Sequence, residues 1–293
     1  MASQTKSVPE LRPRPSVGVG ASYEGRDEAL LAAMLPHVDY LEITPESMAV
    51  MQGDQIRLDP AILAELKNID REKDIIVHGV TLSIGSYDGW SETYLRLMDE
   101  LMAQVRVAWH SEHLGYTNVD GEHVGIMLAL PRREEAADMV SRRVEALQRR
   151  YGIPFLLENI VHVLPDCPAD YSDAGFLNAI TAQTGCGLVL DVYNLECDEH
   201  NHSLDISSFL EELNGEYVRE LHVACGIRKN GFMLDVHSQL PRQCTLDLAQ
   251  QALGNVATEA RVVVYEFMPE AIPGLGHPAI VETLRQMRLR DWS

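Results

Sequence analysis

Hydrophobic and polar residues follow one another along this chain in two alternating textures. The first consists of short runs rich in β-branched and apolar residues. We expect strands in these runs, at 16–20, 38–46, 74–80, 108–115, 154–160, 187–194, 218–226 and 261–267. Runs such as FLLENI and GLVLDVYN stay apolar almost to their ends. This pattern is typical of parallel strands that are buried on both faces.

The second texture lies between the runs and has apolar residues at helical spacing. We expect helices over 28–35, 60–69, 91–105, 131–152, 171–185, 205–215, 244–253 and 278–288. Proline suits the first turn of a helix, and glycine often follows the last turn. We assign these roles to Pro60, Pro131, Gly152, Gly185, Gly215 and Gly254.

Eight consecutive strand–helix units favour a closed barrel over an open doubly wound sheet. The sequence therefore predicts an α/β fold, a single (β/α)₈ TIM barrel that occupies residues 16–293. Residues 1–15 contain three prolines and several charges, so we expect them to form a flexible arm ahead of the barrel.

Composition excludes several classes of protein. With 46% hydrophobic residues the chain can bury a core, which excludes a disordered protein. Its 44 Asp and Glu residues against 24 Lys and Arg give a net charge of −20, which opposes binding to nucleic acid. No apolar run reaches the ~20 residues of a membrane span, and no signal peptide precedes the barrel. Five scattered cysteines without a Cys-x-x-Cys pair suit a reducing compartment, so we expect a cytoplasmic protein.

Polar residues interrupt the apolar runs at or near their carboxyl ends. They are Glu42, Glu46, His78, His113, Glu158, Asn159, Asp191, Asn194, His222 and Glu266. Active sites of barrels form at the carboxyl ends of the strands, so most of these side chains are expected to meet in one axial pocket. Asp235 and His237 lie in the connection after the seventh run, on one side of an extended segment.

Metal ions would explain this collection of carboxylates and imidazoles. Burying them together without compensation would be very costly. Carboxylate and neutral imidazole suit zinc, iron and manganese, and the lack of cysteine among the candidates disfavours a thiolate site. Because there are more than six donors, a cluster of two or three metals is the physical interpretation.

Simpler interpretations exist for individual residues. A single polar residue at a strand end is usually structural. Asp235 and His237 could belong to a solvated loop. Glu42 and Glu46 could each take part in an ion pair at the rim. A polar loop explains Cys197, His200 and His202 in NLECDEHNHSLD. We assign no chemistry to His37, His110, His123, His162 and His277.

In their order, these residues resemble the trinuclear-metal barrel superfamily that includes endonuclease IV and xylose-isomerase-like proteins. Within it, the chain is more similar to the multinuclear non-haem iron-dependent oxidative enzymes, which include the methanobactin and thiaglutamate biosynthesis enzymes. The resemblance spans nearly the whole barrel, through LEITPES, VHGVTLSIGS, SEHLGY, LENI, LDVYNL, ELHVACG, LDVH and YEF.

The resemblance implies two iron positions that share Glu158. The first would be held by His78, His113 and Glu158. The ligands of the second would be Glu158 as a bridge, Asp191, His222 and Glu266.

A third, more labile metal position would use Asn194, Asp235 and His237. Asn194 stands where the endonuclease pattern has histidine, and this amide best separates the two patterns. The residues expected to contact substrate are Glu42, Glu46, Ser47 and His202.

Three positions depart from the oxidative family. The family commonly has Asn at the place of Ser47, Asp at the place of Glu112 and an acidic residue at the place of Met268. All three are expected near the metals without being ligands, so they concern the substrate and the surroundings of the metals.

The resemblance implies an oxygen-dependent enzyme with two or three iron ions in mixed Fe(II)/Fe(III) states and molecular oxygen as cosubstrate. The substrate would be a ribosomally synthesised precursor peptide, with a cysteine as the expected target. A small partner protein that binds the leader peptide is also implied.

Three alternatives remain open. An endonuclease IV-like metal-dependent phosphoesterase is disfavoured by Asn194 and by the charge of −20. A xylose-isomerase-like sugar isomerase generally needs a lysine in its pocket, whereas Lys67, Lys73 and Lys229 lie outside the strand ends. The third alternative is a metal-dependent protein that binds a peptide without modifying it.

Overall fold

The computed structural model of the protein describes residue 12, residues 17–164 and residues 167–292. Eight parallel strands form a closed barrel, in the order β1-β14-β11-β10-β9-β6-β5-β2. They are β1 (Gly18–Tyr23), β2 (Tyr40–Ile43), β5 (Asp74–Gly79), β6 (Val107–His113), β9 (Phe155–Glu158), β10 (Gly187–Asp191), β11 (Val218–Val223) and β14 (Val262–Tyr265). Each predicted run overlaps one of these strands, so the predicted barrel is confirmed.

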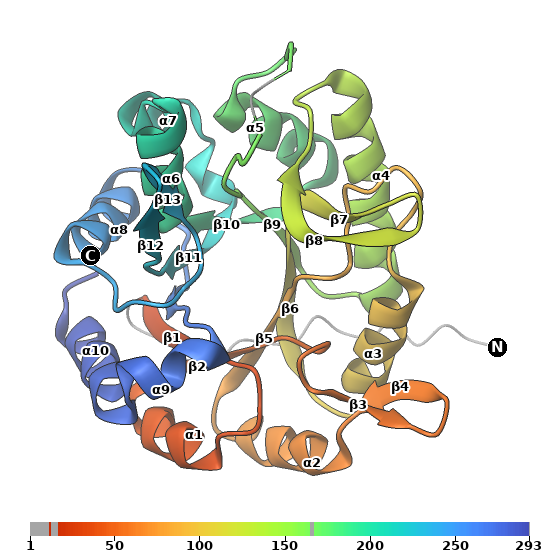
Figure 1. Ribbon diagram of the computed structural model, residues 1–293, viewed down its shortest axis with the longest axis vertical. Helices are drawn as coiled ribbons and strands as arrows, with labels where there is room; N and C mark the ends of the chain where they lie inside the picture. The colour runs from red at the N-terminus through yellow and green to blue at the C-terminus, as the bar shows by residue number, and fades with distance from the viewer. Residues whose placement is uncertain (1–11, 13–16, 165–166, 293) are drawn as a thin grey trace.

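Helices surround the barrel on its outside (Figure 1). They are α1 (Glu28–Met34), α2 (Pro60–Ile69), α3 (Glu92–Met102), α4 (Glu134–Tyr151), α5 (Asp173–Thr184), α6 (Val192–His202), α7 (Ile206–Glu212), α8 (Gln243–Asn255), α9 (Ile272–Leu275) and α10 (His277–Leu289). Three short 3₁₀ helices complete the set, at Leu35–His37, Gly215–Tyr217 and Pro269–Ala271. The main hydrophobic core lies between the barrel and this layer of helices.

Several helix boundaries follow from local chemistry as predicted. Pro60 occupies the first turn of α2, and the side chain of Asp59 accepts a hydrogen bond from Ala61 N. Gly152 and Gly185 end α4 and α5 in the left-handed conformation, with φ of 68° and 67°. Glycine adopts this conformation without the steric cost that other residues bear.

Other local predictions are wrong. Pro131 precedes α4, which begins at Glu134, Gly215 begins a 3₁₀ helix, and Gly254 lies inside α8. The polar stretch after β10, interpreted as a loop, is the helix α6. Its first turn is capped by Asp191, whose Oδ1 accepts a hydrogen bond from Asn194 N at 2.7 Å.

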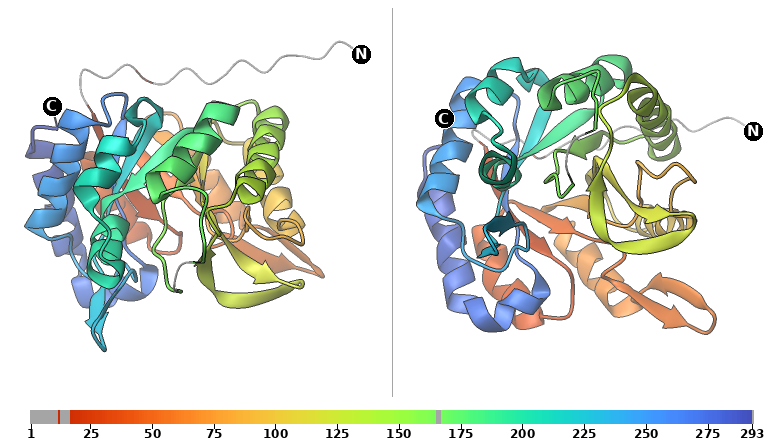
Figure 2. Two further views of the ribbon diagram at one scale, coloured as in Figure 1. Left: turned by 90° about the horizontal axis from the view of Figure 1, so that it is seen from above. Right: turned by 45° about the horizontal axis from the view of Figure 1, so that its top comes forward.

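Three β-hairpins lie in the segments that follow barrel strands and were not predicted. They are β3 (Ala49–Gln52) with β4 (Gln55–Leu58), β7 (Gly115–Val119) with β8 (Glu122–Ala129), and β12 (Ile227–Lys229) with β13 (Phe232–Leu234). The left view of Figure 2 shows β7–β8 and β12–β13 projecting from the same end of the barrel. This end is the one toward which all barrel strands run.

The interior of the barrel contains two layers of side chains. Residues two apart on a strand point to the same side, so one strand contributes to both layers. The lower layer consists of Tyr40, Ile76, Ala108, Trp109, Leu156, Val189, Val262 and Val264. The upper layer, at the carboxyl ends of the strands, consists of Glu42, His78, Glu158, Asp191, His222 and Glu266, all buried. On β1, Gly20 leaves room for the lower layer, because a Cβ there would lie 2.9 Å from Val264 Cγ2.

Most of the predicted arm 1–15 lies outside the described residues, and the division into arm and barrel stays a prediction. Arg12 is described, and its Nη1 lies 2.6 Å from Asp74 Oδ1 at the start of β5. Among the described residues, the helices are all too short or too polar to cross a membrane.

Candidate metal centre

The upper layer brings potential ligand atoms from five barrel strands to the mouth of the barrel. One group combines His78, His113 and Glu158, and its ligand atoms lie within 4.8 Å of one another. A second group satisfies the same limit and consists of Glu158, Asp191, His222 and Glu266, and a third consists of Glu42, His78 and His222. The first two groups share Glu158, and they are the sets that the sequence resemblance implied for two iron positions.

Glu158, the last residue of β9, is at the centre of this cluster. Its Oε2 lies 3.0 Å from His78 Nε2 and 3.4 Å from His113 Nε2. Its Oε1 lies 3.5 Å from His222 Nδ1. The two carboxylate oxygens therefore face different histidines, as a bridge between two cations requires.

Hydrogen bonds on the far side of the ring orient His78 and His113. Ser111 Oγ donates to Val77 O at 3.1 Å, so it accepts from His78 Nδ1, which lies 2.9 Å away. His113 Nδ1 lies 3.1 Å from the carbonyl of Gly79, which can only accept. Both rings then donate from Nδ1 and direct Nε2 toward Glu158, so Nε2 is the nitrogen that would bind a metal ion.

Asp235 and His237 lie beside the second group, after β13. His237 Nε2 is 2.7 Å from Asp235 Oδ1 and 3.8 Å from Glu266 Oε2. His237 has a positive φ of 41°, so the backbone turns here and is not extended as the sequence predicted. Gly226 permits this path, because a Cβ there would clash with the carbonyl of Leu234.

Asn159 holds Asp191, the last residue of β10, and Asn194 in place through hydrogen bonds. Its side chain accepts from Asp191 N and donates to Asp191 O, both at 2.9 Å. Its carbonyl accepts a hydrogen bond from Asn194 Nδ2 at 3.0 Å. The amide oxygen of Asn194 is therefore turned away from Asn159 and is available as a ligand.

The predicted ligands leave buried polar atoms without a hydrogen-bond partner among the described residues. These atoms are His78 Nε2, Glu158 Oε2, Asp191 Oδ2, Asn194 Oδ1, both ring nitrogens of His222, Asp235 Oδ1, His237 Nε2 and Glu266 Oε2. Such groups are costly to bury unless something binds them. Eight of the nine predicted ligands contribute to this set, so the residues fit a multinuclear metal site.

Histidines counterbalance the charge of Glu158. Burial alone would raise the pKa of Glu158, but His113, His78 and His222 hold it well below its ordinary value. In return, Glu158 and Glu112 raise the pKa of His113 to about 10 although its burial acts in the opposite direction. Positive charge thus stabilises this carboxylate, whether histidines or metal ions supply it.

Two other carboxylates have opposite pKa shifts. Burial would raise the pKa of Glu266, yet His222 and His237 lower it to about 2. The pKa of Asp191 is raised well above its ordinary value, first by burial and then by three acidic neighbours, of which Glu158 has the largest effect. Asp191 is therefore the member of the cluster that most lacks a positive partner.

The residues predicted to contact substrate lie in different environments. Glu42 is 1% exposed and its Oε2 lies 3.1 Å from His222 Nε2 inside the barrel, so it forms no ion pair at the rim. Glu46 Oε1 accepts hydrogen bonds from Val80 N at 2.9 Å and Thr81 N at 2.7 Å.

The other two predicted contacts have neighbours outside the upper layer. Burial raises the pKa of Glu24, and Ser47 acts against this rise. His202, the last residue of α6, contacts the carbonyl of His162 through Nε2.

The positions that depart from the family pattern also differ from one another. Glu112 is fully buried, and its Oε1 accepts a hydrogen bond from His113 N at 3.3 Å. Met268 is 41% exposed, and its N donates to His237 O at 3.1 Å. Both positions adjoin predicted ligands.

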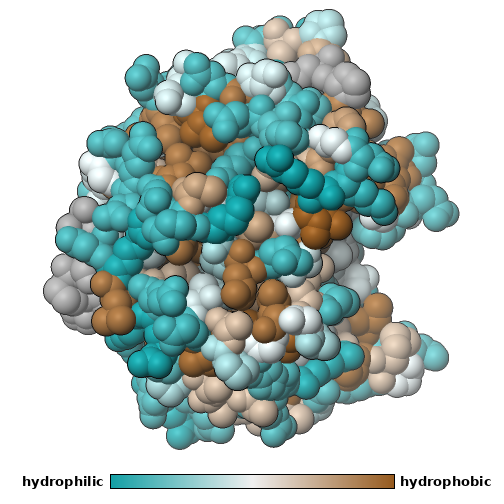
Figure 3. Space-filling view, turned by 60° about the vertical axis from the view of Figure 1, so that its left-hand side comes forward, coloured by the Kyte–Doolittle hydropathy of each residue, from teal (hydrophilic) through white to brown (hydrophobic). Residues whose placement is uncertain are grey.

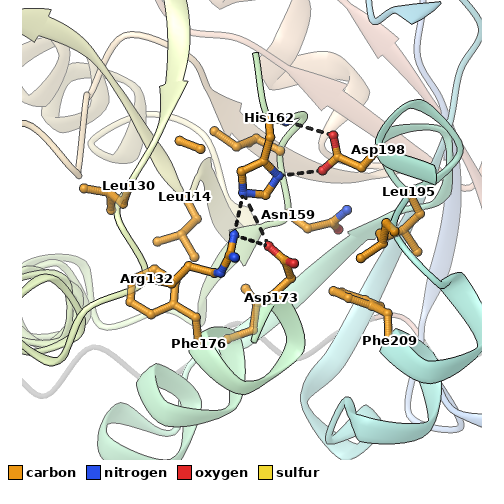
Figure 4. A pocket seen from close by; sticks show the side chains of 14 residues that line it. Leu114, Leu130, Arg132, Asn159, His162, Asp173, Phe176, Leu195, Asp198 and Phe209 are labelled. Carbon is orange, nitrogen blue, oxygen red and sulfur yellow. Dashed lines mark hydrogen bonds and ion pairs between the residues drawn. The ribbon is translucent and has the colours of Figure 1, made fainter. Parts of the chain in front are cut away.

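A second polar cluster surrounds His162, a residue to which the sequence analysis assigned no chemistry (Figure 4). His162 Nδ1 lies 2.6 Å from Asp198 Oδ2, and its Nε2 lies 3.4 Å from Asp173 Oδ1. Arg132 Nη1 donates to the same Asp173 oxygen at 2.8 Å. These groups border an otherwise mainly apolar cavity of about 40 Å³ and connect the segment after β9 to α5 and α6.

Glu220 and Trp109 are parts of the site that the sequence analysis missed. Glu220 Oε1 lies 3.4 Å from His222 Nε2, and Trp109 Nε1 donates to Glu220 Oε2 at 2.8 Å. The available signal was spacing, because Glu220 stands two residues before His222 in the same run and so points to the same side of the strand.

Comparisons with known proteins concern the family and the fold. A profile of the family described as "RiPP precursor modification enzyme MbnB/TglH/ChrH" matches residues 16–271. A UPF0276 protein of Anaeromyxobacter sp. (strain Fw109-5) is 30% identical over 226 residues, which cover 77% of each chain.

Two solved structures share the fold at low sequence identity. The IolI protein with a bound zinc atom superposes with a TM-score of 0.61 at 17% identity, covering 94% of this chain and 98% of that one. Endonuclease IV from Thermus thermophilus gives 0.55 at 17% identity, with 94% and 99% covered.

Proposed function

Because the chain belongs to the family of RiPP precursor modification enzymes described as MbnB/TglH/ChrH, we propose that it oxidatively modifies a precursor peptide with iron and molecular oxygen. RiPPs are ribosomally synthesised and post-translationally modified peptides. The proposed target is a cysteine of the precursor. The observation that carries the proposal is the set of unpartnered ligand atoms at the barrel mouth.

The chain would hold two or three iron ions through residues of the upper layer and the segments next to it. The proposed ligands are His78, His113 and Glu158 for the first ion, Glu158, Asp191, His222 and Glu266 for the second, and Asn194, Asp235 and His237 for the third. When bound, iron would supply the reaction with molecular oxygen and the removal of electrons from the peptide.

The protein itself contributes orientation and shielding from water. Ser111 and the carbonyl of Gly79 hold the rings of His78 and His113 so that both present Nε2. Burial of the carboxylates limits the access of water to the centre. The third position has an amide in place of one charged or imidazole ligand, which suits an ion that exchanges more readily.

The surface around the mouth supports a peptide substrate. Among the described residues, every exposed large hydrophobic side chain except Leu289 lies in a segment that follows a barrel strand. Tyr87 after β5 is 92% exposed, and Phe232 on β13 is 52% exposed. Figure 3 shows hydrophobic side chains in patches between hydrophilic ones on one side of the molecule. Exposed apolar groups of this kind suit a polypeptide better than a sugar.

Two further parts of the proposal concern the cellular context. A small partner protein would bind the leader peptide and present the precursor to the mouth. The five cysteines are free in the structure, which fits a reducing compartment such as the cytoplasm.

The test is co-production of the protein with the short open reading frames encoded beside its gene, followed by mass spectrometry of the peptides. We expect an oxygen- and iron-dependent mass change that is lost in Glu158→Gln, His222→Ala and Asp235→Ala. Glu282→Gln, an exposed acidic position on α10, is the matched control and should retain the change.

Other outcomes would reject the proposal in distinct ways. A mass change that survives all three substitutions would remove the chemistry from this site. An unmodified peptide that nevertheless binds the metal-loaded protein would indicate a binding protein. Cleavage of abasic DNA by the zinc form would indicate a phosphoesterase, and ketose formation from an aldose would indicate an isomerase.

A further inference from the structure

Both ring nitrogens of the buried His222 face carboxylates. Nδ1 lies 2.9 Å from Glu266 Oε2 and 3.5 Å from Glu158 Oε1, on the side of the proposed second metal. Nε2 lies 3.1 Å from Glu42 Oε2, on the opposite side. A neutral imidazole has one N–H and one lone pair, so only one of these sides can receive a metal ion.

We propose that Glu42 is a positioning residue of the metal centre. Its carboxylate accepts the Nε2–H of His222, and the lone pair of Nδ1 is thereby directed to the metal ion shared with Glu158 and Glu266. The inference rests on the ligand set of the proposed function, and it is independent of the identity of the metal, of oxygen and of the peptide.

Because Glu42 and His222 are both buried, the contact between them determines how the His222 ring is oriented. Glu42 is 1% exposed and His222 is fully buried, so water cannot replace the carboxylate as acceptor. The contact also crosses the barrel, because β2 and β11 are not neighbours and are separated by β1 and β14. In a buried site a charge-assisted hydrogen bond is strong, and it increases the basicity of the histidine as a ligand.

Glu220 is the other acceptor near Nε2, and the geometry ranks it second. Its Oε1 is 3.4 Å from Nε2, while its Oε2 already accepts from Trp109 Nε1. Glu42 Oε2 is nearer, at 3.1 Å, and no hydrogen bond to another group occupies either Glu42 Oε2 or His222 Nε2 among the described residues. Glu42 therefore determines the position of the His222 proton.

The arrangement distinguishes His222 from the histidines of the first position. His78 and His113 donate from Nδ1 to neutral groups, a hydroxyl and a carbonyl, and present Nε2. In the proposed arrangement His222 donates from Nε2 to a carboxylate and presents Nδ1. The two metal positions would then differ in the group that accepts the far N–H of their histidines, which is a way to give the ions different properties.

The test uses the full chain, zinc as a diamagnetic probe, and ¹⁵N NMR of the histidine rings. In the zinc-loaded wild type we expect His222 to carry its proton on Nε2 and to bind zinc through Nδ1. Glu42→Leu should remove this preference and lower the affinity for zinc about 10- to 100-fold. Glu42→Gln keeps an oxygen acceptor, so it should preserve the protonated nitrogen with a smaller loss of about 3- to 10-fold.

Glu46→Gln is the matched control, because it makes the same change in the segment after β2 while Glu46 binds the backbone of Val80 and Thr81. It should leave the His222 signals and the zinc affinity unchanged. Wild-type zinc affinity in Glu42→Gln, or an unchanged His222 spectrum in Glu42→Leu, would overturn the proposal. Loss of one zinc equivalent, with the rest bound as tightly as before, would make Glu42 a ligand and would also overturn it.

Failure of the proposed function gives a different result. A precursor peptide of unchanged mass would reject the oxidative reaction, yet it would leave the zinc affinities and the ring signals as described. If Glu42→Leu does not fold, Glu42→Gln alone still decides, because its reduced affinity and its preserved protonation state are both required.

Discussion

The two layers inside the barrel come from the same strands and have opposite chemistry. On β9, Leu156 packs in the apolar lower layer, and Glu158, two residues later, is the central carboxylate of the upper layer. On β10, Val189 and Asp191 show the same change. The lower layer holds the strands together by burial of apolar surface, whereas the upper layer buries charge that the fold does not need. Stability and chemistry are thus separated by about 7 Å along each strand.

The largest effect should come from the centre of the upper layer. Glu158→Gln removes the charge that two proposed metal positions share, so we expect bound metal to fall from two or three equivalents to at most one, with at least ~100-fold weaker binding. The fold should persist, because the lower layer is untouched. Metal analysis after anaerobic loading, together with circular dichroism, measures both.

Glu282→Gln on α10 serves as the control for this change and should bind metal like the wild type. If Glu158→Gln retained all the metal, the upper layer would not be the metal site. If it unfolded, the separation between the two layers would fail.

The second effect concerns the lower layer of the same strand. Leu156→Ala creates a cavity in a fully buried site, and we expect a loss of ~2–5 kcal/mol in the free energy of unfolding. Metal affinity of the folded protein should change by no more than a few-fold. Denaturant unfolding of the metal-free protein measures the first value, and chelator competition measures the second.

Leu289→Ala is a suitable comparison, since Leu289 is 86% exposed and its truncation should cost less than ~0.5 kcal/mol. A loss of metal affinity in Leu156→Ala as large as that in Glu158→Gln would show that the layers are not independent.

The third effect is a pH dependence of metal binding at the barrel mouth. The pKa of His113 is raised to about 10 by Glu158 and Glu112 against the effect of burial. His113 is therefore protonated at neutral pH in the metal-free protein, and a metal ion must displace this proton. We expect zinc affinity to rise between pH 6 and 8 by up to about tenfold per pH unit for each proton displaced.

Calorimetry in two buffers of different ionisation enthalpy measures the released protons directly. Binding that is independent of pH, with no proton release, would contradict a site built on these histidines.

The smallest expected effect is an unchanged or slightly higher free energy of unfolding when Asp191 loses its charge. Burial and acidic neighbours raise the pKa of Asp191, so its charge opposes folding. Asp191→Asn removes the charge and can keep the cap of α6, because asparagine is an equally good N-cap. The metal-free variant should be as stable as the wild type or up to ~1 kcal/mol more stable, while metal binding weakens.

Thermal unfolding in the presence of a chelator measures this difference. A clear loss of stability in Asp191→Asn would show that the upper layer also supports the fold.

The eight strands and the cluster of polar side chains at their carboxyl ends could be predicted because a parallel barrel imposes simple rules. Buried strands such as 187–191 are apolar runs, and their carboxyl ends meet at one face whatever their distance in the sequence. A polar residue at the carboxyl end of an apolar run therefore indicates a candidate site residue, and Glu158 and Asp191 were identified in this way.

The helix α6 was missed because residues that cap it or face the site stand where apolar residues would otherwise indicate a helix. Asp191 caps its first turn, Asn194 directs its amide toward the site, and the rest of the helix is largely polar. The hairpins were missed although the turn signals Asp120-Gly121 and Asn230-Gly231 were present. All four residues have positive φ, as the tight turn of a two-residue hairpin requires.

The role of Glu42 could not be predicted from the sequence. The sequence places Glu42 at a strand end, but the barrel geometry decides that it faces Nε2 of His222 from across the interior. Contacts of this kind depend on the closure of the sheet, which no local pattern describes.

The most direct test of the account is an anomalous diffraction map at the iron edge, from crystals of the protein loaded anaerobically with Fe(II). The account predicts two or three iron peaks at the carboxyl ends of the strands, with Glu158 between two of them. An iron-loaded crystal with peaks elsewhere, or with a single peak that does not contact Glu158, would contradict it.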